Sequence, residues 1–153
     1  MADYCKKNKI QAVGLADSYN LCGALEFAEK ISKVGTQPII GTQINLSYDN
    51  LIGKITLYAT SEEGYKNLTK LSSLSYLKNK NSNEPYCEIE DLILNNKDLI
   101  ILTGNYQNFF GKIFLANKKK VFEKLIKQLK QFFNDRLYIE IQRHSEVQEN
   151  HYE

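Results

Sequence analysis

Few side chains in this 153-residue chain have both the type and the spacing needed for nucleophilic or metal-binding chemistry. The three cysteines, Cys5, Cys22 and Cys87, are far apart and form no Cys-x-x-Cys pair. An odd number of widely spaced thiols argues against a disulfide framework or a zinc site and favours a reducing cytoplasm. Cys22 and Cys87 are therefore predicted to be buried apolar side chains rather than nucleophiles.

Asp17 closes the apolar run 11–17 and is a candidate metal ligand. A cap of the following turn is the favoured interpretation, because short acidic side chains accept hydrogen bonds from nearby backbone N–H groups. Gly23 follows in the segment NLCG, which lacks the glycine pattern of a phosphate-binding loop, so a tight turn is predicted. For His144, beside Arg143, a surface or packing role is favoured over a place in a metal cleft. His151 lies near the end of the chain, and its position suggests no role.

The charges are nearly balanced, with 18 lysines, two arginines and a net charge of +2. Arginine is the usual side chain for reading bases, so its scarcity argues against sequence-specific DNA recognition. The run Lys118, Lys119 and Lys120 could contact a DNA backbone, but a solvated helix start is favoured. No apolar run approaches 18 residues and the start lacks a signal peptide's apolar core, so no membrane partner is expected.

Apolar runs alternate with helical patterns along the chain. The pair Asp49 and Asn50 predicts a turn that joins two neighbouring strands. The first strand, rich in Ala, Val and Leu, is predicted to be buried on both faces. Strands are predicted at 11–17, 38–46, 55–59, 99–103 and 136–141.

The predicted helices are marked by caps and by apolar stripes. Ser61 is a candidate N-cap, with two acids in the first turn. The strongest pattern, 118–133, places Val121, Leu125, Leu129 and Phe132 or Phe133 on one face. In 23–34 the stripe is Leu25, Ala28, Ile31 and Ser32. Helices are predicted at 2–8, 23–34, 61–74, 88–94 and 118–133, with a polar loop at 78–85.

This alternation predicts an α/β fold with mostly parallel strands and outer helices. The chain opens without a strand before its first helical turn and stops just after a strand. Both ends are interpreted as cuts through a fold, so residues 1–153 are expected to form a single partial domain.

Four segments carry a family resemblance. The run AVGLADSYNLCGALEFAEKISKVGTQPIIGTQINL resembles the early part of the PHP domain in bacterial DNA polymerase III alpha subunits. The runs LYATSEEGYKNLTKLSSLSYL, LIILTGN and DRLYIEIQRH are similar to later segments in the same order, so the resemblance covers nearly all of residues 4–144. It implies a distorted βα barrel, here partial, without its first strand and its later strands.

Active members of this family bind a metal cluster and hydrolyse phosphoesters, and the resemblance identifies the ligand positions present in this chain. Asp17 matches an acid of the motif, but Ser18 stands where the family has histidine. Gln43 matches a glutamate, Lys54 a histidine and Asn105 a cysteine. Hydroxyl, amide and ammonium groups do not replace anionic or imidazole ligands. The site is therefore expected to be degenerate, with no catalytic residue, metal or cofactor.

The resemblance implies part of the alpha subunit of a replicative DNA polymerase, itself a nucleotidyltransferase, in the cytoplasm. The segment is expected to be structural and to dock partners, namely other domains of the subunit and a separate proofreading exonuclease, with loop 78–85 a candidate contact. DNA is expected only through the full polymerase. A stand-alone metal-dependent phosphoesterase or exonuclease is the alternative, and a decayed, split gene is a third.

Overall fold

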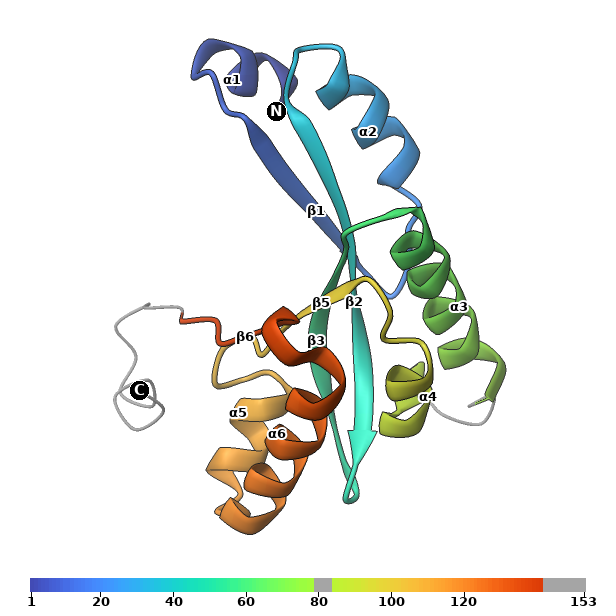
Figure 1. The fold of residues 1–153 in the computed structure, drawn as a ribbon, viewed down its shortest axis with the longest axis vertical. Coiled ribbons are helices and arrows are strands. Elements are labelled where there is room, and N and C mark those ends of the chain that lie inside the picture. Colours follow the sequence, from blue (N-terminus) through green and yellow to red (C-terminus); the bar gives the residue numbers. More distant parts are fainter. Residues whose placement is uncertain (79–83, 142–153) are drawn as a thin grey trace.

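The computed structural model describes residues 1–78 and 84–141, which form one mixed sheet and a set of helices (Figure 1). The strand order is β1-β2-β3-β5-β6, and β4 pairs with the C-terminal part of β2. The strands are β1 (Ala12–Ser18), β2 (Gln37–Tyr48), β3 (Leu51–Ala59), β4 (Tyr86–Glu88), β5 (Leu99–Leu102) and β6 (Leu137–Tyr138). The helices are α1 (Ala2–Lys7), α2 (Ala24–Ser32), α3 (Glu62–Lys78), α4 (Ile89–Leu94), α5 (Phe109–Leu115) and α6 (Lys119–Phe133).

The prediction of mostly parallel strands is confirmed. β2 is parallel to β1 and to β4, and β5 is parallel to β6. β3 is the exception, because it is antiparallel to both β2 and β5. The turn between β2 and β3 falls on Asp49 and Asn50, with φ angles of 52° and 61°. Asn and Asp tolerate this left-handed conformation, and such turns match the twist of a hairpin.

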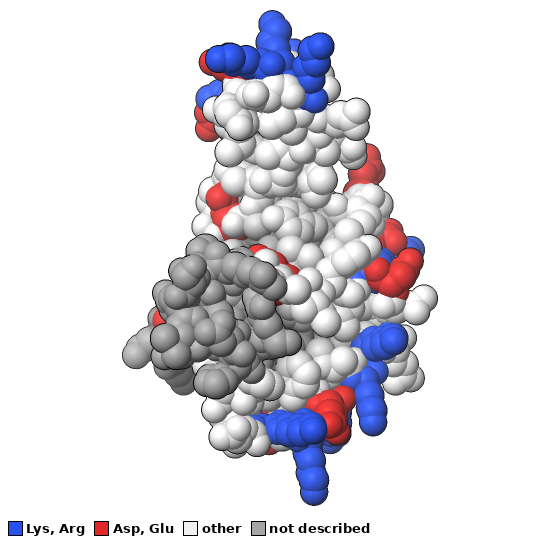
Figure 2. Space-filling view, turned by 90° about the vertical axis from the view of Figure 1, so that its left-hand side faces the viewer, with Lys and Arg blue, Asp and Glu red and all other residues white. Residues whose placement is uncertain are grey.

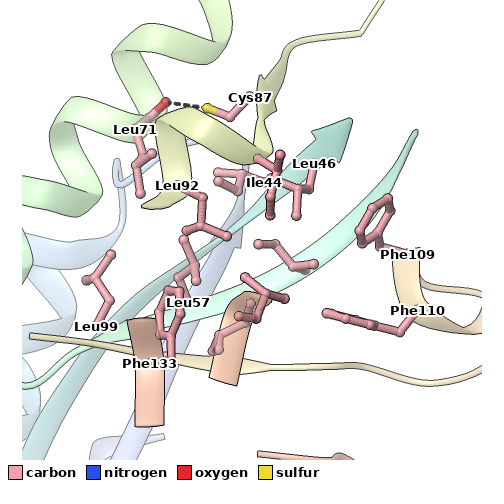
Figure 3. Close-up of a cluster of buried hydrophobic side chains, with 14 of the residues drawn as sticks. Ile44, Leu46, Leu57, Leu71, Cys87, Leu92, Leu99, Phe109, Phe110 and Phe133 are labelled. Carbon is pink, nitrogen blue, oxygen red and sulfur yellow. Dashed lines mark hydrogen bonds between the residues drawn. The ribbon is translucent and has the colours of Figure 1, made fainter. Parts of the chain in front are cut away.

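Side chains of helices α3 to α6 pack with β2, β3 and β5 in a hydrophobic core, part of which is drawn in Figure 3. Alternation along the paired strands directs Ile44 and Leu46 of β2, together with Ile55 and Leu57 of β3, toward the face of the sheet that holds this core. All four side chains are fully buried. The opposite face carries the polar and half-buried side chains of the same strands, and we call it the open face.

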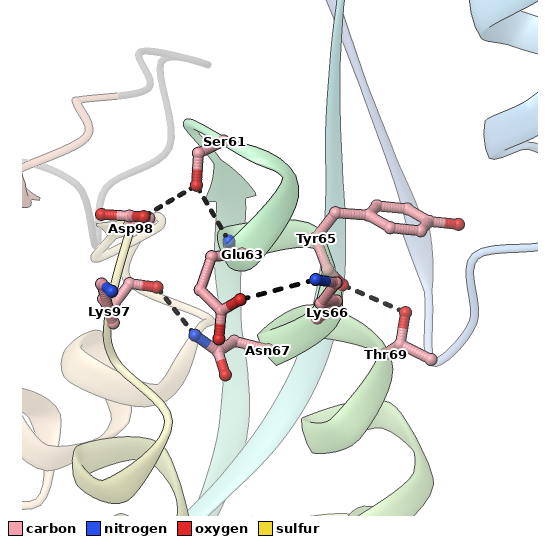
Figure 4. A network of polar contacts seen from close by, with 9 residues as sticks. Ser61, Glu63, Tyr65, Lys66, Asn67, Thr69, Lys97 and Asp98 are labelled. Carbon is pink, nitrogen blue, oxygen red and sulfur yellow. Dashed lines mark hydrogen bonds and ion pairs between the residues drawn. The ribbon is translucent and has the colours of Figure 1, made fainter.

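A polar cluster holds the start of α3 against the loop before β5 (Figure 4). The Ser61 hydroxyl accepts the Gly64 N–H at 3.1 Å and donates to Asp98 Oδ2 at 2.7 Å. The Asn67 amide donates to the Lys97 carbonyl at 3.0 Å. The predicted N-cap at Ser61 is thus confirmed, and it also joins α3 to a segment far away in the sequence.

Three expectations about the strands need correction. β1 is not buried on both faces, because it stands at the end of the sheet and its residues are exposed or half-buried. The last strand is two residues long, since only Leu137 and Tyr138 pair with the short β5. Ile139 and Ile141, expected to lie in that strand, are 77% and 65% exposed. β1 and β6 lie at opposite ends of the described sheet, so closure into a barrel stays a prediction.

The helices also differ from the expectation in detail. On α2, Leu25 is 74% exposed and Ser32 is exposed, whereas Ile31 is buried as predicted. On α6, Leu125 and Leu129 are buried as expected, and Phe133 rather than Phe132 completes the core. α3 continues past residue 74 to Lys78. The sequence interpretation missed β4 and α5 altogether.

Candidate functional site

Asp17 acts as a cap within the turn that links β1 to α2. Its Oδ2 accepts the Gly23 N–H at 3.0 Å, at the residue immediately before the helix. Thr42 of the neighbouring strand donates its hydroxyl to the Asp17 carbonyl at 2.9 Å. Asn20 closes the turn by accepting the Cys22 N–H at 2.9 Å. The cap and the tight turn that the sequence favoured are therefore present.

Three of the positions that the resemblance matched to metal ligands meet on the open face, and we call Ser18, Gln43 and Lys54 the open-face cluster. Ser18 and Gln43 are register partners on β1 and β2, and the Ser18 hydroxyl donates to Gln43 Oε1 at 2.9 Å. Lys54 of β3 brings its Nζ to 3.5 Å from Ser18 Oγ. The cluster thus spans three adjacent strands and carries a single charge, the ammonium group.

Tyr19 and Asn45 extend this cluster, and the sequence interpretation did not identify them. The Lys54 Nζ lies 5.0 Å from the centre of the Tyr19 ring, within range of a cation–π interaction. The Tyr19 hydroxyl donates to Asn45 Oδ1 at 3.3 Å, and the Asn45 amide donates to Glu84 Oε2 at 3.1 Å. Asn45 lies between buried Ile44 and Leu46 and on the same face as Gln43, and this period-two polar pattern of β2 could have identified it. Tyr19 follows β1 and has no such signal in the sequence.

The other two positions that the resemblance matched to ligands, Asp17 and Asn105, make hydrogen bonds within their own turns. Alternation along β1 sends Asp17 and Ser18 to opposite faces, so the Asp17 carboxylate meets α2 and not the open-face cluster. Asn105 follows β5, and its Oδ1 accepts the Gln107 N–H at 3.0 Å on the way into α5. The structure therefore brings together Ser18, Gln43 and Lys54, and gives Asp17 and Asn105 separate local roles.

The structure describes some of the remaining candidate residues, and others lie outside the described ranges. Cys87 is buried as predicted, but Cys22 is exposed because it lies in the surface turn after β1. His144, Arg143 and His151 lie outside the described residues, as does most of loop 78–85, whose Lys78 ends α3. Lys118 precedes α6 and pairs with Asp49 at 2.8 Å. No helix in the described ranges combines the length and the apolar character that crossing a bilayer requires.

The donor atoms of the open-face cluster are a hydroxyl, an amide oxygen and an ammonium group. An ammonium group has no lone pair and repels a cation, and neutral oxygens alone are weak ligands for transition metals. Within residues 1–78 and 84–141, no three side chains of His, Cys, Asp or Glu gather in a way that could hold a metal ion. Among the described residues, the side chains of the open-face cluster form hydrogen bonds between strands.

Comparison with known families identifies the class of protein to which this mixed sheet and its helices belong. The PHP domain family model matches residues 1–144, so the chain belongs to the PHP domain family. The resemblance to bacterial DNA polymerase III alpha subunits is likewise confirmed. The chain is 39% identical to the DNA polymerase III subunit alpha of Rickettsia felis over 145 residues, which cover 94% of this chain.

Further relatives are the DNA polymerase III alpha subunits of Caulobacter vibrioides, 34% identical over 89% of this chain, and of Haemophilus influenzae, 32% identical over 97%. The chain spans only 12% to 13% of the length of these relatives. Among solved structures, a putative metal-dependent phosphoesterase from Bifidobacterium adolescentis aligns with a TM-score of 0.44 and 10% identity, covering 69% of this chain and 61% of that one.

Proposed function

We propose that this chain serves as the PHP part of a bacterial replicative DNA polymerase alpha subunit, where it is structural, docks partners and does not hydrolyse phosphoesters. The polymerase assignment is supported by relatives that share 32% to 39% of its residues. Other domains of the alpha subunit and a separate proofreading exonuclease are the proposed partners, in the cytoplasm. Nucleotidyl transfer is assigned to the whole subunit rather than to this segment.

The position of Lys54 is the main support for the proposed loss of phosphoester hydrolysis. Its ammonium group lies 3.5 Å from Ser18 Oγ, among residues that stand at ligand positions of the family. A metal cluster would place several positive charges beside this group, and none of the three side chains of the open-face cluster is a carboxylate that could offset them. We propose that hydrogen bonds from Ser18 and Lys54 now join β1, β2 and β3 where metal ligands would otherwise do so.

The proposal predicts that purified protein carries less than one equivalent of Zn²⁺ or Mn²⁺ and does not degrade DNA. The physical reason is the donor set of Ser18, Gln43 and Lys54. Elemental analysis measures the metal, and a 5′-labelled single strand incubated with added Mn²⁺ measures 3′-exonuclease activity. Stoichiometric metal, together with hydrolysis that Asp17→Ala abolishes, would instead establish the phosphoesterase alternative.

Restoring the ligand types should restore metal binding, because the three side chains already converge. We expect the triple variant Ser18→His, Gln43→Glu, Lys54→His to bind Zn²⁺ at least about 100-fold more tightly than the wild type, since even outer partners of metal ligands change affinity by about 10- to 100-fold. Isothermal titration calorimetry with Zn²⁺ measures this difference.

The matched control moves the carboxylate while keeping both histidines. In Ser18→His, Ser47→Glu, Lys54→His the glutamate stays on the same face of β2 but lies four residues away, roughly 13 Å at about 3.3 Å per residue. This control should bind Zn²⁺ more weakly than the variant with Glu at position 43. Equal affinities would show that the three positions do not form one site.

A further inference from the structure

Helix α6 carries a row of lysines on the side that faces away from the core. Leu125, Leu129 and Phe133 are buried in the core. Lys120, Lys124 and Lys127 are all exposed and follow one another at i, i+4 and i+7, a spacing that places them on one side of a helix. We call these three residues the α6 lysine row, and it extends over about 10 Å at about 1.5 Å per residue. Further exposed lysines flank it at positions 119 and 130.

No lysine of the α6 lysine row forms an ion pair within the part of the protein that the structure describes, although the exposed Glu123 lies three residues after Lys120 and four before Lys127. The ion pairs within residues 1–78 and 84–141 involve Lys30, Lys66, Lys78 and Lys118 but no lysine of α6. The first turn of α6 contains no acid, although the helix dipole favours acids there and disfavours cations. The stability of the helix therefore does not account for this arrangement.

Figure 2 shows Lys and Arg side chains gathered mainly at the two ends of the molecule, with acidic residues around its middle and also beside the basic groups at each end. The lysines at the α1 end are explained by the helix itself. Lys6 and Lys7 lie in the last turn of α1, where cations offset the negative end of the helix dipole. α6 has only Lys130 in such a position, and the α6 lysine row lies outside it. The net charge of +2 for the whole chain conceals this local excess.

The chemistry of the row matches a phosphate backbone better than a protein surface. Lysine is depleted in the cores of protein interfaces, which rely on aromatic and apolar anchors. An apolar groove of about 390 Å³, lined by Phe114, Asn117, Lys119, Phe122 and Glu123, includes no residue of the row. Lysine acts as a point charge without bidentate reading of bases. About 10 Å of duplex DNA carries roughly six phosphate charges, enough to engage three ammonium groups.

We propose that the α6 lysine row is a sequence-independent contact for the sugar–phosphate backbone of DNA. Lys120, Lys124 and Lys127 each neutralise one phosphate, and Lys119 and Lys130 strengthen the local positive potential. This contact goes beyond the proposed polymerase role and does not depend on it, since it rests on α6 alone. It concerns affinity and orientation, and gives no preference for a base sequence.

Fluorescence anisotropy of a fluorescein-labelled 20-base-pair duplex between 50 and 200 mM NaCl tests the proposal with the full chain. We expect the variant Lys120→Gln, Lys124→Gln, Lys127→Gln to bind at least about tenfold more weakly at 50 mM NaCl. The slope of log K against log salt should fall by about 2 to 3, because each lost phosphate contact removes about 0.9. The control Lys6→Gln, Lys7→Gln, Lys9→Gln removes the same charge at the other end and should leave the slope unchanged.

Three outcomes would overturn the proposal: no binding by the wild type at 50 mM NaCl, an equal loss in the control, or competition by polyglutamate as strong as that by DNA at equal charge. The last outcome would point to an acidic protein partner. Acetylation of lysines, mapped by mass spectrometry with and without the duplex, checks the result without substitutions. The duplex should protect Lys120, Lys124 and Lys127 and leave Lys6 reactive, and uniform protection would contradict the proposal.

Discussion

Replacing Phe109 by alanine should lower the free energy of unfolding by about 3–5 kcal/mol, the cost of removing a large aromatic side chain from a close-packed core. Phe109 is fully buried, and its ring meets that of Phe110 edge to face at 5.5 Å. Its backbone lies against Gly53 of β3, where an added Cβ would come within 2.7 Å of the Phe109 Cα. α5 is thus held tightly on the sheet. Urea unfolding followed by circular dichroism measures the loss.

The variant Phe132→Ala is the matched control, because the same side chain is 39% exposed on α6. Its removal should cost clearly less than the removal of Phe109, since it leaves no closed cavity. A similar loss in the two variants would show that α5 does not pack on β3 as described.

The second large effect is a loss of stability at alkaline pH that depends on Cys87. Burial raises the pKa of this thiol to about 12 from an ordinary value of 9.0, and the nearby Asp91 adds to the rise while Lys78 opposes it. The thiol donates a hydrogen bond to the Leu71 carbonyl at 3.2 Å (Figure 3). The folded protein therefore retains the proton in a pH range where the unfolded chain loses it.

The direction of the pH dependence follows from the higher pKa of Cys87 in the folded protein than in the unfolded chain. Below about pH 9 the thiol is protonated in both states and its contribution is complete; between about pH 9 and 12 only the unfolded chain ionises, so stability falls as the pH rises. A rise of three pKa units corresponds to at most roughly 4 kcal/mol. We expect chemical denaturation at pH 8, 9.5 and 10.5 to show a steeper loss for the wild type than for Cys87→Ala. The exposed Cys22 provides the control, and Cys22→Ala should retain the wild-type slope. Equal slopes for the wild type and Cys87→Ala would contradict the assignment.

Elements that depend on neighbours in the sequence were predictable. The strands β1, β2, β3 and β5 follow from apolar runs bounded by turn residues, and Asp49 with Asn50 marks the hairpin because these residues accept positive φ angles. The caps at Ser61 and Asp17 belong to the same class, since each is satisfied by a backbone N–H within six residues. Ser18, Gln43 and Lys54 were named for a different reason, the family resemblance, and the structure places the three side chains together.

Features that depend on tertiary contacts could not be predicted from local sequence patterns. α5 has seven residues and no side-chain cap, so its helical state depends on burying Phe109 and Phe110 against β3. β4 is three residues long and exists because β2 offers it an edge. Tyr19 and Asn45 joined the cluster only through the pairing of separate strands. Local patterns determine which segments form helices and strands. Burial and pairing between distant segments decide which face each side chain reaches. The energies of burial and pairing depend on residues that are far apart in the sequence, so local patterns do not contain them.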